Sequence, residues 1–202
     1  MDESVERLLA GLKKRKITAS YLEDRKAARE KLLELIPDQC SVGIGGSITI
    51  EQLELEDALG EKGCSVYWHW RVPAEKIKET RRQAGVADVY LSSTNAVTED
   101  GVLINIDGFG NRVASMVFGP QKVIIVAGIN KIVGDVHEGL VRIKRDACTQ
   151  NARRLQRKTP CASGECTDCS SPERMCNVTT IIEGKPNGVE MVVLLVGKSL
   201  GY

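Results

Sequence analysis

Short apolar runs rich in β-branched residues alternate with amphipathic stretches along most of this chain. The runs are bounded by Gly, Asn, Asp or Pro, a pattern typical of strands, and they predict strands over residues 17–22, 41–44, 64–70, 86–91, 102–106, 123–128, 178–182 and 189–196. Apolar residues at helical spacing predict helices over residues 2–14, 24–36, 74–83, 113–118 and 135–155, and another after Ser47. This alternation predicts an α/β fold with a mostly parallel open sheet flanked by helices.

Two turn signals predict that neighbouring strands form antiparallel hairpins. Residues 99–101 (Glu-Asp-Gly) separate the strand at 86–91 from the strand at 102–106. Asn187-Gly188 separates the last two strands, and Asn-Gly is the strongest short signal for a hairpin. The unbroken apolar run at 189–196 favours a central position for the last strand.

Polar residues crowd directly after several of the predicted strands. Ligands of open α/β sheets bind outside the carboxyl ends of the strands, so we expect a ligand site there. The candidate residues are Gly45, Gly46, Ser47, Thr94, Asn95, Glu99, Asp107, Asn111 and Arg112. The alternative is a set of ordinary turns, because Gly, Asn, Asp and Ser dominate turns for local backbone reasons.

The candidates suggest a site for an anion. Backbone N–H groups at Gly45, Gly46 and Ser47 precede a helix, whose start favours phosphate or carboxylate. The alternative is a tight turn with a helix cap. Arg112 carries a planar guanidinium that holds a carboxylate or phosphate with two hydrogen bonds. His69 lies between two tryptophans and is expected to be packed and hydrogen-bonded, not catalytic.

Four cysteines lie close together in a polar loop at residues 159–177, in the pattern Cys-x4-Cys-x2-Cys-x6-Cys. They are Cys161, Cys166, Cys169 and Cys176. Thiolates two residues apart in a turn are natural ligands for zinc or for cluster iron. The spacing of the first three cysteines matches plant-type ferredoxins, which favours an iron-sulfur cluster over zinc. Two disulfides or unligated thiols are the alternatives. Cys40, Cys64 and Cys148 lie in or beside apolar segments and are expected to be small core residues.

The run TNAVTEDGVLINIDGFGNRVA at residues 94–114 resembles the LUD-domain family of lactate-utilisation proteins. The resemblance extends to GIGGSIT at 43–49, to the four-cysteine loop and to the terminal LGY, so it covers nearly the whole chain. It implies one domain over residues 1–202, of the fold group that includes sugar-phosphate isomerases, CoA transferases and formyltetrahydrofolate cyclo-ligase. It also implies a role in organic-acid (L-lactate) utilisation, without an agreed set of catalytic residues. Glutamate is the nucleophile of CoA transferases, so Glu99 is either a nucleophile or a solvated turn charge.

Composition narrows the class of partner. The 202 residues contain 28 Lys and Arg against 27 Asp and Glu, and this balance gives no general attraction to nucleic acid or to an anionic membrane. The chain has no apolar run of the roughly 20 residues that a membrane span needs. Its first residues, MDESVERLLAGLKKRK, lack the apolar core of a secretory signal, which predicts a cytoplasmic protein. Seven cysteines without an export signal favour thiols or metal ligands over disulfides.

Together these observations predict a cytosolic component of organic-acid utilisation. It would bind a small anionic molecule at the sheet edge and carry a four-cysteine centre, with an electron-transfer protein as partner if that centre is an iron-sulfur cluster. The N-terminal helix either covers the sheet or contacts a second copy in a homo-oligomer. Two alternatives stay open: a non-catalytic redox-sensing or binding module with structural zinc, and an enzyme similar to CoA transferases or phosphosugar isomerases.

Overall fold

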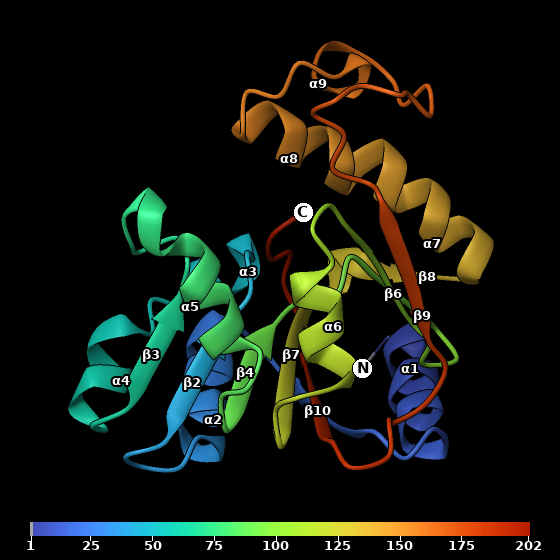
Figure 1. Cartoon of the computed structure of the whole chain (residues 1–202). Coiled ribbons are helices and arrows are strands. Elements are labelled where there is room, and N and C mark those ends of the chain that lie inside the picture. The colour runs from blue at the N-terminus through green and yellow to red at the C-terminus, as the bar shows by residue number, and fades with distance from the viewer. Residues whose placement is uncertain (1) are drawn as a thin grey trace.

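The main sheet of the protein is parallel throughout and runs through the centre of the molecule (Figure 1). The computed structural model describes residues 2–202, and within them this sheet has six strands in the order β1-β10-β7-β4-β2-β3. The strands are β1 (Thr18–Leu22), β2 (Ser41–Ile44), β3 (Ser65–Trp68), β4 (Val89–Ser92), β7 (Lys122–Gly128) and β10 (Glu190–Val196). The expected mostly parallel open sheet flanked by helices is confirmed.

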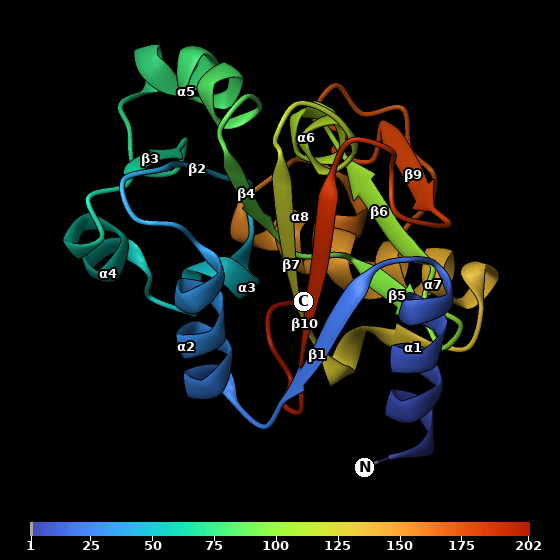
Figure 2. The ribbon, with the colours of Figure 1, turned by 90° about the horizontal axis from the view of Figure 1, so that it is seen from below.

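Helices and a second sheet cover the two faces of the main sheet, as the view in Figure 2 shows. One face packs against α2, α3 and α4. The other face packs against α1, α5, α6 and the second sheet. The bounds of these helices are α1 (Glu3–Lys14), α2 (Arg25–Leu35), α3 (Ile48–Glu51), α4 (Glu56–Glu61), the 3-10 turn η1 (Ala74–Lys76), α5 (Ile77–Ala84) and α6 (Asn111–Val117).

Strand β10 lies in the interior of the main sheet, between β1 and β7, as the apolar character of its sequence favoured. Val192, Leu194 and Val196 belong to the core on one face of the sheet, whereas Met191, Val193 and Leu195 belong to the core on the other. The strand is therefore apolar in both alternating rows, as buried parallel strands are. Moving β10 to an edge would expose part of these rows, at a cost of about 1.5–3 kcal/mol for each side chain.

The predicted hairpin at Asn187-Gly188 is wrong for this reason. Gly188 does make a turn with a positive φ of 81°, but β10 enters the main sheet between β1 and β7. The preceding strand β9 (Val178–Ile182) pairs antiparallel with β6 instead. Burial of β10 on both faces thus outweighs the local preference of the turn.

The second sheet has the order β8-β5-β6-β9 within the described residues. It contains β5 (Ala96–Thr98), β6 (Leu103–Asp107), β8 (Ile132–Val133), which follows the 3-10 turn η2 (Ile129–Lys131), and β9. The hairpin expected at residues 99–101 exists, but its first strand is β5 and not the strand at 86–91. Strand β4 cannot take that place, because both of its edges are already paired with β2 and β7.

A helical arm crosses above the carboxyl ends of the main strands and carries the cysteine loop (Figure 1). It consists of α7 (Val136–Arg142), the π-helical turn η3 (Ile143–Ala147) and α8 (Cys148–Arg154), and α9 (Pro160–Ser163) begins the loop. Asp135 caps α7 by accepting a hydrogen bond from the N–H of Glu138 over 2.8 Å. Across residues 2–202, no helix combines the length and the apolar character that a membrane crossing demands.

Candidate functional site

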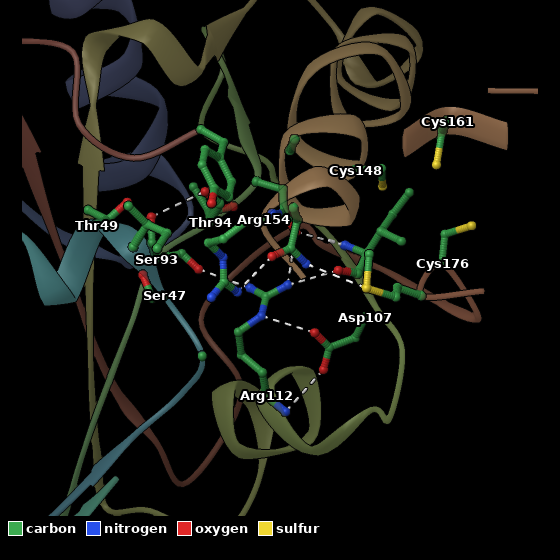
Figure 3. A pocket seen from close by; sticks show the side chains of 18 of the residues that line it. Ser47, Thr49, Ser93, Thr94, Asp107, Arg112, Cys148, Arg154, Cys161 and Cys176 are labelled. Carbon is green, nitrogen blue, oxygen red and sulfur yellow. Dashed lines mark hydrogen bonds and ion pairs between the residues drawn. The ribbon is translucent and has the colours of Figure 1, made fainter. Parts of the chain in front are cut away.

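A cavity of about 130 Å³ lies at the carboxyl end of the main sheet, beneath the helical arm. The turn after β2 and the turn after β4 form one side, and the junction of β6 with α6 forms another. Helix α8 and the cysteine loop form the remaining wall (Figure 3). We call this cavity the arm pocket. Ser47 and Arg112, which are far apart in the sequence, both line it, and so do Gly46, Thr94, Asn95 and Asp107.

The turn after β2 contributes a capped helix start. The Ser47 hydroxyl accepts a hydrogen bond from the N–H of Ile50 over 3.2 Å. Gly45 does not line the pocket, since its N–H donates to the carbonyl of Leu91 within the main sheet. Helix α3 has only four residues, so the partial positive charge at its N-terminus is small. The expected set of backbone donors is therefore reduced to the region of Gly46 and Ser47.

Arg112 is the centre of a buried hydrogen-bond network. Its Nε donates to Asp107 over 3.1 Å, and the four N–H groups at its two Nη atoms donate to acceptors on β6 and on the turn after β4. These acceptors are the carbonyls of Ser93 and Ile106 and the side-chain oxygens of Asn105 and Asn95, at 2.8–3.0 Å. A guanidinium has five N–H donors. A ligand would therefore have to displace one of these acceptors before Arg112 could hold it.

The other polar candidates near Arg112 also hold the backbone in place. Thr94 donates to the carbonyl of Ala96 over 2.8 Å. Asn95 accepts from the N–H of Ile106 over 3.0 Å as well as from Arg112. Asp107 caps α6 by accepting from the N–H of Arg112 over 3.1 Å. Asn111 is the first residue of α6 but does not line the arm pocket.

Lys131 is a pocket residue that the sequence reasoning missed. Its side chain is only 3% exposed, and its Nζ lies 2.8 Å from both Thr49 Oγ1 and Ser93 Oγ. No carboxylate within residues 2–202 forms an ion pair with it. Burial, and then the charges of Arg142 and Arg112, lower the pKa of Lys131 to about 7. The sequence signal for its burial was its position three residues after the apolar run at 123–128.

Three arginines of the arm and loop were also missed. Arg154 lines the pocket and lies over the ring of Trp70 at 4.6 Å. Arg142 is buried and donates to the carbonyls of Asn130 and Asn95. Arg174, from the cysteine loop, lines the pocket and pairs with Asp168 at 2.9 Å.

The cysteine loop approaches the same pocket, which the sequence alone could not establish. Cys161, Cys169 and Cys176 line it, and Cys166 does not. Cys148 on α8 also faces the pocket, and burial, followed by the charges of the loop cysteines, raises the pKa of its thiol to about 12. All seven cysteines within the described chain are free thiols.

The loop as positioned does not form a coordination sphere. Nowhere between residues 2 and 202 do three or more His, Cys, Asp or Glu side chains converge as a metal site would require. The arrangement therefore fits neither a cluster nor a zinc ion without a rearrangement of the loop. The metal centre at these four cysteines stays a prediction from their spacing.

Glu99 and His69 lie apart from this chemistry. Glu99 forms an ion pair with Arg7 of α1 at 2.7 Å, beside a separate hollow near β8. His69 is buried, as expected, and burial lowers its pKa to about 4. Its Nδ1 has no hydrogen-bond partner in the described part of the chain, so the expected hydrogen bond at that atom is absent.

Comparisons with known proteins identify the family. The model of the LUD domain matches residues 5–196. A crystal structure of a DUF162 family protein from Deinococcus radiodurans has a TM-score of 0.57, with 14% identity, over 96% of this chain and 97% of that chain. At this identity the likeness shows the fold. No curated protein matches the chain. Because the family model spans almost the whole sequence, the chain belongs to the LUD-domain family, which implies a role in lactate utilisation.

Proposed function

We propose that the arm pocket binds a small carboxylate of the lactate class, a 2-hydroxy or 2-oxo acid, as part of lactate utilisation. The observation that carries this proposal is the charge balance of the pocket. Within the described residues it is lined by one side-chain carboxylate, Asp107, and by four basic side chains. Asp107 pairs with Arg112, and Arg174 pairs with Asp168. Arg154 is the cation that the carboxylate of a ligand would meet.

Burial disfavours a charged amine, because removing a charge from water is costly. Lys131 has only hydroxyl partners, so it lines the pocket as a polar group that needs no counter-charge. The carboxylate of a ligand would instead pair with Arg154, whose side chain also lines the pocket. The Ser47 turn and the amides around Asn95 would then orient the rest of the ligand.

The size of the pocket favours a small acid. The pocket has a volume of about 130 Å³. Pockets for drug-sized molecules are larger, at about 300–1,000 Å³. The pocket therefore suits a three-carbon acid better than a nucleotide or a whole CoA ester. The position of Glu99 outside it also weakens the CoA-transferase alternative.

We include the four-cysteine centre in the proposal only because thiolates are ligands for zinc and for cluster iron. Cys161, Cys166, Cys169 and Cys176 would hold an iron-sulfur cluster, with zinc as the alternative, after the loop draws together. A cluster transfers single electrons, so an electron-transfer protein would be the partner. The proposed location is the cytoplasm, where thiols stay reduced.

Isothermal titration calorimetry tests the anion proposal. The ligands are L-lactate, pyruvate and lactamide, which keeps the shape of lactate without its charge. We expect the two acids to bind and the amide not to bind. Arg154→Gln should weaken binding at least about 10-fold, equivalent to about 1.4 kcal/mol.

Arg145→Gln is the matched control, because Arg145 lies on the same arm, is exposed and pairs with Asp146 at 2.8 Å. Its affinity for lactate should equal that of the unaltered protein. The proposal is rejected if neither acid binds, or if lactamide binds as tightly as lactate.

A further inference from the structure

The hydrogen bonds around Lys131 favour a neutral amine. Nζ lies 2.8 Å from Thr49 Oγ1 and 2.8 Å from Ser93 Oγ. The hydroxyl of Thr49 donates to the carbonyl of Leu200, and the hydroxyl of Ser93 donates to the carbonyl of Thr94. With their own hydrogens used in this way, both hydroxyls act as acceptors toward Nζ. They match the two N–H groups of an uncharged amine and leave its lone pair free.

The charges around Lys131 favour the same form. Two guanidiniums act on it, Arg142 from α7 and Arg112 from α6, and Asp107 is engaged by Arg112. The pKa of Lys131 is about 7, so roughly half of the molecules carry a neutral amine at pH 7, against about one in three thousand for an ordinary lysine. Desolvation and a neighbouring cation are the two conditions that turn a lysine into a nucleophile toward carbonyl carbon.

Building on the proposed function, we infer that Lys131 forms an imine with the keto carbon of a 2-oxo acid bound in the arm pocket. The Nζ lone pair attacks the carbonyl carbon, and the carbonyl oxygen takes up a proton to give a carbinolamine. Nitrogen then loses its remaining protons as the hydroxyl leaves as water. The net change is amine plus ketone to imine plus water, so no oxidant or reductant is consumed.

Imine formation would distinguish two classes of ligand that carry the same charge. A 2-oxo acid offers a carbonyl carbon to Lys131, and a 2-hydroxy acid does not. Both carry the carboxylate that Arg154 would meet. The site would therefore hold the oxidised acid covalently and the reduced acid only by contacts.

Reductive trapping of the imine tests the inference. The full chain is incubated with pyruvate and sodium cyanoborohydride, digested, and mapped by mass spectrometry. We expect the reduced adduct at Lys131 to form at an initial rate at least about 10-fold above that of the exposed lysines, as its larger neutral fraction implies. Added L-lactate should slow this labelling, because it occupies the same pocket.

Lys131→Arg should abolish the adduct at this position, whereas Lys122→Arg, at a lysine that pairs with Glu190, should leave it unchanged. The inference is overturned if the label spreads evenly over the surface lysines, or if lactate gives no protection. The positions of the label in the unaltered protein test the inference even if a variant does not fold. Calorimetry without reductant separates the two proposals: acids that bind while Lys131 stays unlabelled refute the imine, and acids that do not bind refute the pocket's function.

Discussion

Arg112 and Asp107 form an ion pair at 3.1 Å in which the guanidinium is only 8% and the carboxylate only 13% exposed. The pair joins the end of β6 to the start of α6, and the same guanidinium holds the turn after β4. Sequence reasoning selected both residues as ligand contacts. Their contacts show that they shape the arm pocket by fixing three segments around it.

We expect Arg112→Met to reduce the free energy of unfolding by about 3–5 kcal/mol, the usual effect of removing one partner of a buried ion pair. The loss follows from leaving Asp107 charged and unpaired in the interior. Urea unfolding followed by circular dichroism measures it. Arg145→Met, at an exposed pair, should change stability by less than about 1 kcal/mol. A stable Arg112→Met protein that only loses ligand affinity would instead favour a direct clamp.

Because of Lys131, the free energy of unfolding should rise as the pH rises above about 7. Its pKa is about 7 in the folded chain against 10.5 for an ordinary lysine. Between these values the unfolded state binds the proton and the folded state does not, so the free energy of unfolding rises with pH. The contribution is about 1.4 kcal/mol per pH unit.

Lys131→Met removes this titration but keeps most of the side-chain volume. We therefore expect the difference in stability between the unaltered protein and this variant to shift in favour of the unaltered protein as pH rises above 7. Parallel denaturant titrations across this range measure the shift. A constant difference would show that Lys131 keeps its ordinary pKa.

The metal content of the purified protein should depend on the four cysteines of the loop. In protein purified without oxygen, we expect iron with a visible absorption that bleaches on reduction, and Cys169→Ser should lose most of it. Cys64→Ser is the control, because Cys64 lies beside Cys40 at the amino ends of β3 and β2, with the sulfurs 3.9 Å apart. Elemental analysis that finds zinc without iron would remove the redox role, and protein free of any metal would remove the centre.

Glu99→Gln should leave ligand binding and any turnover unchanged. Its partner Arg7 is 51% exposed and Glu99 itself 29%, so the pair contributes less than about 1 kcal/mol to stability. Calorimetry with lactate and an assay with an acyl-CoA donor check this expectation. Loss of an acyl-transfer activity in the variant would revive glutamate as the nucleophile.

Local patterns in the sequence predicted the elements well. The run at 41–44 is β2 to the residue, and the helices predicted from residues 24 and 135 begin directly after Asp24 and Asp135, which cap them. These features depend on a few neighbouring residues, so the sequence contains what decides them. Strand pairing does not have this property: β9 leaves the predicted hairpin because of contacts with β6, which lies far away in the chain.

The pocket was only partly predictable for a similar reason. Ser47 follows β2 and Asp107 ends β6, so both could be found by looking at the carboxyl ends of strands. Lys131 gains its character from Thr49, Ser93 and Arg142, which approach it only in the folded chain.

The central place of β10 has a consequence for synthesis of the protein. Strands β1 and β7 each pair with β10, so the main sheet stays split until residues 190–196 have left the ribosome. Until then the emerging polypeptide exposes the unpaired edges of β1 and β7, and unpaired strand edges are prone to association with other chains. Association of unfinished chains should therefore lower the yield of this protein in a cell.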